Sequence, residues 1–214
     1  MTYKNSQVRK YCIEYNDDLY VFYLTKEVAI GDAPIIIAYL QQFRPILASK
    51  REVKNGKMPW YSLNWARNPE IFEANEKIVN SRRAKTNTFA LETRQYYEQS
   101  DMMITIIKEQ WKQEYSTKYI LALLNSKPYY LWLRYKGKVK GNMLELYGAP
   151  LEEIPIIQAE RQIKNKIEKI VDQIIEQPTN DELLHKIDLC IYDALNLSKK
   201  EIDLLEKMQF DFDK

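Results

Sequence analysis

The sequence predicts an α+β protein, a small mixed β-sheet domain with packed helices followed by a C-terminal helical hairpin. In the first half of the chain, short runs rich in Tyr, Val, Ile and Phe have the composition of half-buried strands. After Pro155 the apolar residues instead recur with the period of an amphipathic helix. With 45% hydrophobic and 29% charged residues, the composition is that of a globular protein. We therefore expect one domain over residues 1–155 and a helical tail over residues 156–214 that packs on that domain or on a partner.

The first predicted elements are two strands, residues 11–15 and 19–24. Polar residues at positions 16–18 predict a turn that joins them. Residues 35–49 follow as a predicted helix. Pro34 suits the first turn of that helix, because an amide hydrogen is not needed there.

The predicted helix should kink or end at Pro45, because proline lacks the amide donor that a helix interior uses. Residues 50–75 then contain a turn signal at Asn55-Gly56 and breakers at Pro59 and Pro69. This pattern predicts a long irregular loop with short strands. Loops of such length inside a domain are more often functional than incidental.

Three further strands are predicted at residues 76–80, 88–91 and 102–107, which are rich in β-branched and aromatic side chains. Residues 117–133 have the apolar spacing of a helix. They lead into residues 134–141, a basic segment with two glycines.

The tail predicts helices. Residues 158–177 place isoleucines and a valine on one face and charges on the other. Pro178 ends this helix, and the apolar residues of segment 183–195 predict a second one. A short third helix is predicted over residues 199–208.

The sequence lacks the residues that metal sites, nucleotide-binding loops and methyltransferase active sites require. The only histidine, His185, lies in a helical stretch, and Cys12 and Cys190 have no partner at metal-ligand spacing. A glycine-rich phosphate loop is absent, and so is the Pro-Pro pair of amino-methylating DNA methyltransferases. We therefore expect no catalytic residues, no metal ligands and no cofactor in this chain. Because no signal-peptide pattern is present and the most apolar stretch, residues 33–40, is too short to span a bilayer, we expect a cytoplasmic protein without a membrane partner.

Basic residues gather in three segments. Residues 43–67 contain six basic side chains and one acid among Trp, Tyr and Phe. Residues 77–94 contain five basic side chains and one acid, and residues 134–140 contain four basic side chains and no acid. The three segments together carry about +13 while the whole chain is +2, so the remainder is near −11. Such asymmetry suits a groove for a polyanion, because neutralised phosphates release counterions. We expect a nucleic-acid partner.

Three sequence blocks carry a family resemblance. They are YLQQFRPILASKREVKNGKMPWYSLNWAR, EKIVNSRRAKTNTFAL and YILALLNSKPYYLWLRYKGKVKGNMLELYGAPLEEIPI. With these and the closing LLHKIDLCIYDALNLSKKEI, the chain from about Val8 to Leu205 resembles the TaqI-like specificity domain. This is the C-terminal target-recognition domain of type IIG restriction-modification enzymes and related adenine methyltransferases. Many relatives have Pro-Gln before the arginine where this chain has Ser81-Arg82, and recognition loops are where relatives with different target sites should differ.

The resemblance implies a non-catalytic domain that recognises a short double-stranded DNA sequence. A methyltransferase or endonuclease domain or subunit would then supply the chemistry, and S-adenosylmethionine and Mg²⁺ are expected only in those catalytic domains. The residues that family position and charge place at the DNA are Lys50, Arg51, Lys54, Lys57, Trp60, Trp65, Arg67, Arg82, Arg83, Lys85, Asn87, Arg134, Lys136, Lys138 and Lys140.

Different roles are expected within this set. Arg82 and Arg83 are candidates for bidentate contact with guanine, and Asn87 is a candidate for contact with adenine. Trp60 and Trp65 either stack against DNA or anchor their loop to the core. The lysines suit phosphates, which fix register without specifying sequence: Lys50, Lys54, Lys57, Lys138 and Lys140.

Two other classes of function stay open. A structural or interaction module would bind RNA or a protein partner through the helical tail. A nuclease would depend on Glu52 and Lys54, which match the end of a metal-dependent nuclease signature.

Overall fold

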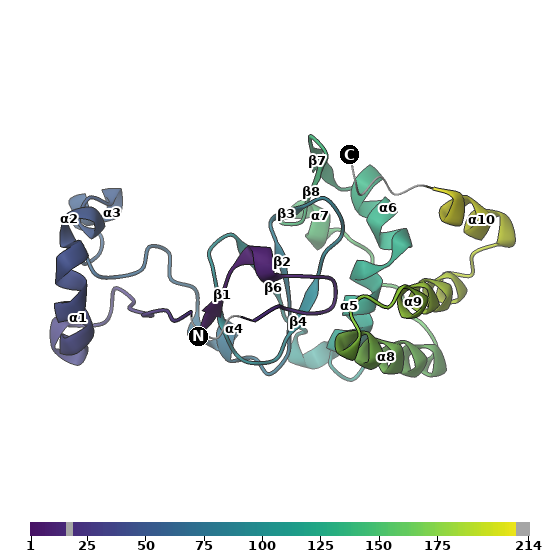
Figure 1. Cartoon of the computed structure of the whole chain (residues 1–214), viewed down its shortest axis with the longest axis horizontal. Coiled ribbons are helices and arrows are strands. Elements are labelled where there is room, and N and C mark those ends of the chain that lie inside the picture. The colour runs from purple at the N-terminus through teal and green to yellow at the C-terminus, as the bar shows by residue number, and fades with distance from the viewer. Residues whose placement is uncertain (16–18, 209–214) are drawn as a thin grey trace.

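The computed structural model describes residues 1–15 and 19–208 (Figure 1). The turn predicted at residues 16–18 lies outside the described residues. The described strands are β1 (Thr2–Tyr3), β2 (Lys77–Ser81), β3 (Arg83–Ala84), β4 (Ala90–Glu92), β5 (Tyr97–Glu98), β6 (Met102–Thr105), β7 (Lys138–Lys140) and β8 (Met143–Glu145). They form a parallel pair, β1-β5, and two antiparallel sheets with the orders β4-β2-β6 and β3-β8-β7.

The helices complete an α+β fold, which confirms the predicted class. They are α1 (Pro34–Leu40), α2 (Arg44–Leu47), α3 (Arg51–Lys54), α4 (Pro69–Glu73), α5 (Thr117–Asn125), α6 (Lys127–Tyr135), α7 (Ala149–Glu152), α8 (Arg161–Glu176), α9 (Asp181–Ala194) and α10 (Lys199–Lys207). In Figure 1 the sheets lie at the centre of the molecule, with α5, α6, α8 and α9 on one side and α1 to α3 at the far end of the other.

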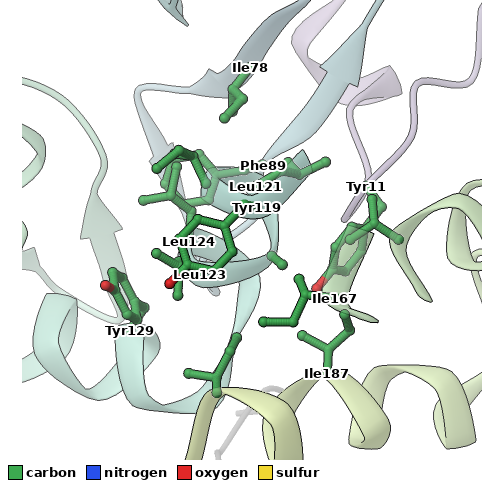
Figure 2. Close-up of a cluster of buried hydrophobic side chains, with 14 of the residues drawn as sticks. Tyr11, Ile78, Phe89, Tyr119, Leu121, Leu123, Leu124, Tyr129, Ile167 and Ile187 are labelled. Atoms are coloured by element: carbon green, nitrogen blue, oxygen red, sulfur yellow. The ribbon is translucent and has the colours of Figure 1, made fainter. Parts of the chain in front are cut away.

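The main hydrophobic core lies between the central sheet and the helices (Figure 2). Helix α5 is its centre, because every residue from Tyr119 to Asn125 is buried. Ile78 and Phe89 belong to this core on the sheet side, and Ile167 of α8 and Ile187 of α9 belong to it on the other. The tail helices α8 and α9 therefore pack on the preceding domain and complete its core.

A buried carboxylate strengthens this connection between tail and domain. The Oδ1 atom of Asp188, on α9, accepts a hydrogen bond of 2.9 Å from the backbone N–H of Lys127, the first residue of α6. The N-cap residue of α6, Ser126, makes no side-chain cap of its own. Asp188, on a different helix, thus accepts a hydrogen bond from an N–H at the start of α6, as an N-cap side chain would.

A buried lysine is surrounded by acceptors. The side chain of Lys77 is fully buried, and its Nζ lies 3.0 Å from a carboxylate oxygen of Glu92 and 3.0 Å from one of Glu98. Nζ also donates to the backbone oxygens of Phe72 and Tyr96. A buried ammonium needs this many partners, because it loses its hydration on burial.

Residues 24–63 form a small helical lobe of their own, which contains α1, α2 and α3. Its core consists of Leu24, Ile37 and Tyr61, with a few half-buried neighbours. The Tyr61 hydroxyl donates to the Val28 oxygen at 2.8 Å, and the Leu63 N–H bonds the Leu24 oxygen at 2.7 Å. Figure 1 shows this lobe at the left, joined to the body by two extended segments.

Two predicted strands in the N-terminal region are wrong. Residues 11–15 contain only isolated bridges, Val8 with Ile13 and Tyr11 with Ala90, and residues 19–24 have no regular structure. The φ angle of Tyr11 is 70°, a left-handed value that a strand residue does not adopt. The apolar residues here serve separate cores, Tyr11 the main one and Leu24 that of the lobe.

Prolines explain why two predicted helices are divided in the structure. The helix expected over residues 35–49 is divided by a 3₁₀ turn at Gln41–Phe43 and ends at Leu47. The stretch expected as one helix over residues 117–133 is two helices, because Pro128 suits the first turn of α6 and not the interior of a longer helix. Residues 50–75 contain the short helices α3 and α4, and none of the described strands. The strands β2, β4 and β6 and the tail helices α8, α9 and α10 confirm their predictions to within a few residues.

Candidate nucleic-acid interface

The β3-β8-β7 sheet carries a row of charges across its three strands. In its register Arg83 of β3 and Lys138 of β7 both lie opposite Glu145 of β8. The next row consists of Ala84, Leu144 and Val139, which belong to the main core. Because side chains alternate between the two faces of a sheet, the charged row is on the outer face.

Glu145 joins the two cations. Its Oε1 accepts from Arg83 Nη2 at 3.2 Å, and its Oε2 lies 3.2 Å from Lys138 Nζ. Burial alone would raise the pKa of Glu145, but Lys138, Tyr147 and Arg83 bring the pKa below its usual value. The carboxylate is therefore ionised at neutral pH and held between two cations.

Arg82, one residue before β3, is exposed and stacks on an aromatic ring. Its guanidinium carbon lies 4.4 Å from the centre of the Tyr147 ring. Arg82 and Arg83 line a shallow polar pocket with Tyr147, Asn5 and Asp101. The two arginines that the sequence singled out thus line one pocket, Arg83 on β3 and Arg82 beside an aromatic ring.

The cations of the third basic segment lie at the same sheet. Lys138 and Lys140 alternate with Val139 on β7, and β7 and β8 form a hairpin around Gly141-Asn142. Gly141 has a φ of 63°, which suits the first position of a two-residue hairpin turn. Lys85 follows β3 closely and Arg134 and Lys136 precede β7, and all three are exposed.

Asn87 does not fit the expected contact with adenine. It is fully buried, and its Nδ2 donates to the backbone oxygens of Leu124 at 2.7 Å and Ser126 at 2.9 Å. Its Oδ1 accepts from Lys10 Nζ at 3.0 Å. Both amide hydrogens are used, so Asn87 connects the segment after β3 to the junction of α5 and α6.

Arg67 and Lys50 also have internal partners. Arg67 Nη2 donates to the backbone oxygens of Ser100 at 3.2 Å and Met102 at 2.6 Å, which ties the segment after the lobe to the body. Lys50 Nζ donates to the Ser62 oxygen at 3.0 Å within the lobe. Within the basic segments, Arg67, Lys50 and Lys77 therefore stabilise the fold rather than present their charge to a ligand.

The two tryptophans have different environments. Trp60 is half-buried against the lobe core, and Arg44 lies 5.4 Å from the centre of its ring. Trp65 is 79% exposed and has a φ of 59°. Trp60 therefore anchors the lobe, whereas Trp65 is available to a ligand.

The remaining cations of the lobe are on its surface. Arg51 pairs with Glu52 at 2.9 Å, and Lys54 and Lys57 are exposed. In the described residues no group of three or more His, Cys, Asp or Glu side chains lies together as metal ligands would. Glu52 is thus paired with an arginine and, within the described residues, belongs to no such group.

The sequence reasoning missed an apolar stripe on the lobe. Ile35, Tyr39, Phe43 and Ile46 are all exposed and are spaced by three or four residues along α1, the 3₁₀ turn and α2. The Tyr39 ring lies 5.9 Å from that of Phe43 and 5.9 Å from that of Phe22. The spacing of the four residues could have been recognised, but only the structure shows that this face is uncovered.

His185 is half exposed, and its Nδ1 lies 3.8 Å from a carboxylate oxygen of Glu206, as expected of a solvated helix residue. In the part of the chain that the structure describes, no helix is long and apolar enough to cross a membrane.

Comparisons with known proteins agree on one family. Residues 1–156 match the model of the TaqI-like C-terminal specificity domain. The type II methyltransferase M.HincII of Haemophilus influenzae is 35% identical over 152 residues, which cover 65% of this chain and 30% of that protein. The type II methyltransferase M.HindII of the same species is also 35% identical over 152 residues, with 65% and 29% covered. The chain thus spans less than a third of the length of these relatives.

Proposed function

The chain belongs to the TaqI-like C-terminal specificity domain family, and on that premise we propose that it recognises a double-stranded DNA sequence for a restriction-modification methyltransferase. In this proposal the chain itself carries out no chemistry. The observation that supports it most strongly is the charged outer face of the β3-β8-β7 sheet, where Arg83, Glu145 and Lys138 form one row.

The β7-β8 hairpin and its neighbour β3 suit the major groove. That groove admits a two-stranded β ribbon, and arginine pairs there with the O6 and N7 atoms of guanine. Arg82 and Arg83 are assigned to base contacts. Lys85, Arg134, Lys136 and Lys140 surround them and are assigned to phosphates, which set the position of the protein on the duplex.

The helical lobe is assigned to the DNA backbone. Arg51 and Lys54 on α3, and Lys57 shortly after it, present their charges at the far end of the molecule from α8 and α9 (Figure 1). Trp65, exposed between lobe and body, is assigned to a stacking or wedging contact. Charges on such a surface add affinity for any sequence, because phosphates are the same at every base pair.

The partner of this chain is assigned as an adenine methyltransferase, with or without endonuclease activity, of the type IIG class. The two relatives are named methyltransferases, and more than two thirds of their length lies outside the matched segment. S-adenosylmethionine and Mg²⁺ would bind in those catalytic parts, and the whole system would work in the cytoplasm.

Selection from random duplexes tests the proposal. The chain, alone and with the methyltransferase of its system, is incubated at low salt with a pool of randomised duplex DNA. We expect a short preferred sequence to be enriched, at least in the presence of the methyltransferase. An absence of DNA binding under both conditions would refute the function.

The alternatives give other outcomes. An RNA-binding module would prefer structured RNA over duplex DNA in competition, and a nuclease would cleave DNA with Mg²⁺ and lose this activity in Glu52→Ala. The tail offers little to a separate partner, because Ile167, Val171 and Ile174 of α8 are buried in the core of this chain. We therefore favour DNA recognition over an interaction module.

A further inference from the structure

We propose that Glu145 is a positioning residue for sequence recognition, which holds Arg83 and Lys138 as a fixed pair of donors for two neighbouring acceptors on DNA. This inference rests on the proposed function. It goes further by assigning a role to an acidic residue that carries no attraction for a polyanion, and by naming the ligand of the pair as a guanine with an adjacent acceptor.

The register places Glu145 where it can direct both cations. It lies on the central strand β8, and Arg83 and Lys138 are its direct neighbours on β3 and β7. Each carboxylate oxygen serves a different cation, Oε1 with Arg83 at 3.2 Å and Oε2 with Lys138 at 3.2 Å. A single acid therefore sets the spacing between two cations from segments far apart in the sequence.

Exposure shows which groups are available to a ligand. The side chain of Glu145 is 4% exposed, whereas those of Arg83 and Lys138 are 47% and 70% exposed. The carboxylate thus lies beneath the cations and cannot contact DNA itself. Because arginine has five N–H donors in a rigid fork, the bond to Glu145 leaves donors of Arg83 for a base.

Tyr147 lies close to the same arginine. It lines the same pocket as Arg82 and Arg83, and its ring stacks with Arg82. Long cationic side chains otherwise sample many rotamers, and ordering them at binding weakens affinity. Arg83 is ordered before DNA arrives, which suits bidentate contact with guanine more than contact with a mobile phosphate.

Glu145 supports specific recognition but should weaken unspecific binding of DNA. Its negative charge offsets one of the cations of the sheet face. Removing that charge should strengthen attraction to any DNA while it releases the arginine from its fixed direction. A residue that served only the stability of the fold would not change specific and unspecific binding in opposite directions.

The experiment compares Glu145→Gln with wild type on the duplex that wild type selects and on a scrambled duplex, over a series of salt concentrations. We expect the ratio of the two affinities to fall about 5- to 100-fold, which corresponds to the loss of one base contact. We also expect binding of the scrambled duplex to strengthen and the salt dependence to steepen by about one charge. Glu176→Gln is the matched control, since Glu176 is an exposed acid at the end of α8 and should leave the ratio unchanged.

A second variant keeps the charge and changes only the geometry. Glu145→Asp withdraws the carboxylate by one methylene, so we expect discrimination to fall while the salt dependence stays as in wild type. The double variant Glu145→Gln/Arg83→Ala should lose less discrimination than the sum of the losses of the two single variants, because both changes remove the Arg83 contact.

The outcomes separate this inference from the proposed function. If wild type binds DNA without sequence preference both alone and with the methyltransferase, the proposed function fails. If wild type discriminates and folded Glu145→Gln or Glu145→Asp discriminates equally well, the role of Glu145 is refuted. A parallel loss of affinity for both duplexes, together with a lower melting temperature, would also refute it.

Discussion

The β3-β8-β7 sheet and the helical lobe both present exposed cations, but they hold them differently. On the sheet, Arg83 and Lys138 are fixed by a buried carboxylate on a strand whose other face belongs to the main core. In the lobe, Lys54 and Lys57 project from or follow a helix of four residues. A basic segment in a sequence thus indicates where cations gather, and the element behind it decides whether a cation has a fixed direction.

The cores behind the two regions differ as well. The sheet rests on a core that extends from β2 through α5 to α8 and α9, whereas the lobe has three buried hydrophobic residues, Leu24, Ile37 and Tyr61. The lobe also exposes the apolar stripe of Ile35, Tyr39, Phe43 and Ile46. We expect the sheet to behave as a rigid surface and the lobe as a separately opening unit.

Lys77→Ala should have the largest effect on stability, because the Lys77 side chain is fully buried in the body of the protein. We expect unfolding to become about 3–5 kcal/mol easier, since Glu92 and Glu98 would remain buried without a cation. Burial raises the pKa of Glu98, so the folded protein holds that proton more tightly than the unfolded chain. The loss of unfolding free energy in Lys77→Ala should therefore become smaller as the pH is lowered into the range where Glu98 becomes protonated.

Denaturant unfolding at pH 7 and pH 5 measures this deficit. Lys85→Ala is the matched control, since Lys85 belongs to the same basic segment but is exposed, and its loss should cost little. A cost for Lys77→Ala as small as that for Lys85→Ala would contradict the internal role.

Tyr61→Ala should unfold the lobe and spare the body. Tyr61 is one of the few buried side chains of the lobe core, and loss of a buried aromatic typically costs about 3 kcal/mol or more. We expect amide exchange protection to disappear over α1 to α3 while the main thermal transition changes little. Phe89→Ala, in the main core, is the comparison and should lower that main transition itself. If Tyr61→Ala destabilises the whole molecule, the two regions fold as one unit.

Asp188→Asn should change the pH dependence of stability at the junction of domain and tail. Burial raises the pKa of Asp188 to about 6 from its usual 3.8, so the wild type loses stability as the pH rises from about 4 to about 6. Asparagine keeps the oxygen that accepts from the Lys127 N–H and cannot ionise. Relative to wild type, the variant should gain about 2 kcal/mol between pH 4 and pH 7. Parallel pH profiles of the unfolding free energy would contradict this.

Trp65→Gly should have the smallest effect on stability. Glycine adopts the positive φ of Trp65 without strain, and the exposed ring contributes little to packing, so we expect a change within about 1 kcal/mol. Trp60→Ala should be clearly more destabilising to the lobe, because Trp60 packs on its core. Weaker DNA binding by Trp65→Gly at unchanged melting temperature would support the assigned contact, and unchanged binding would remove it.

Sequence patterns predicted the regions with long or repeated periodicity. The tail helices follow from the spacing of apolar residues, and the strands β2, β4 and β6 follow from β-branched and aromatic composition. The strand predictions for the N-terminal region were wrong because Tyr11 and Leu24, which are close in sequence, pack in different cores. The break at Pro128 was visible as a signal for a helix start, but the apolar pattern across it looked continuous.

The candidate site was predictable in composition and not in pairing. Arg82 and Arg83 could be singled out because they follow a predicted strand. The turn at Gly141-Asn142, which the sequence analysis did not identify, places Lys138 opposite Glu145, and the pairing of Glu145 with Arg83 joins segments 62 residues apart. The burial of Asn87 depends on the junction of α5 and α6, which its own segment does not indicate.

The discrimination between the selected and the scrambled duplex tests the central claim most directly, measured for Arg83→Ala and for the double variant Lys54→Ala/Lys57→Ala. We predict that Arg83→Ala lowers the ratio of affinities by about 5- to 100-fold. The lobe variant should weaken binding to both duplexes equally and reduce the salt slope by about one per lysine. Loss of discrimination in the lobe variant, with full discrimination in Arg83→Ala, would contradict the assignment of sequence recognition to the sheet.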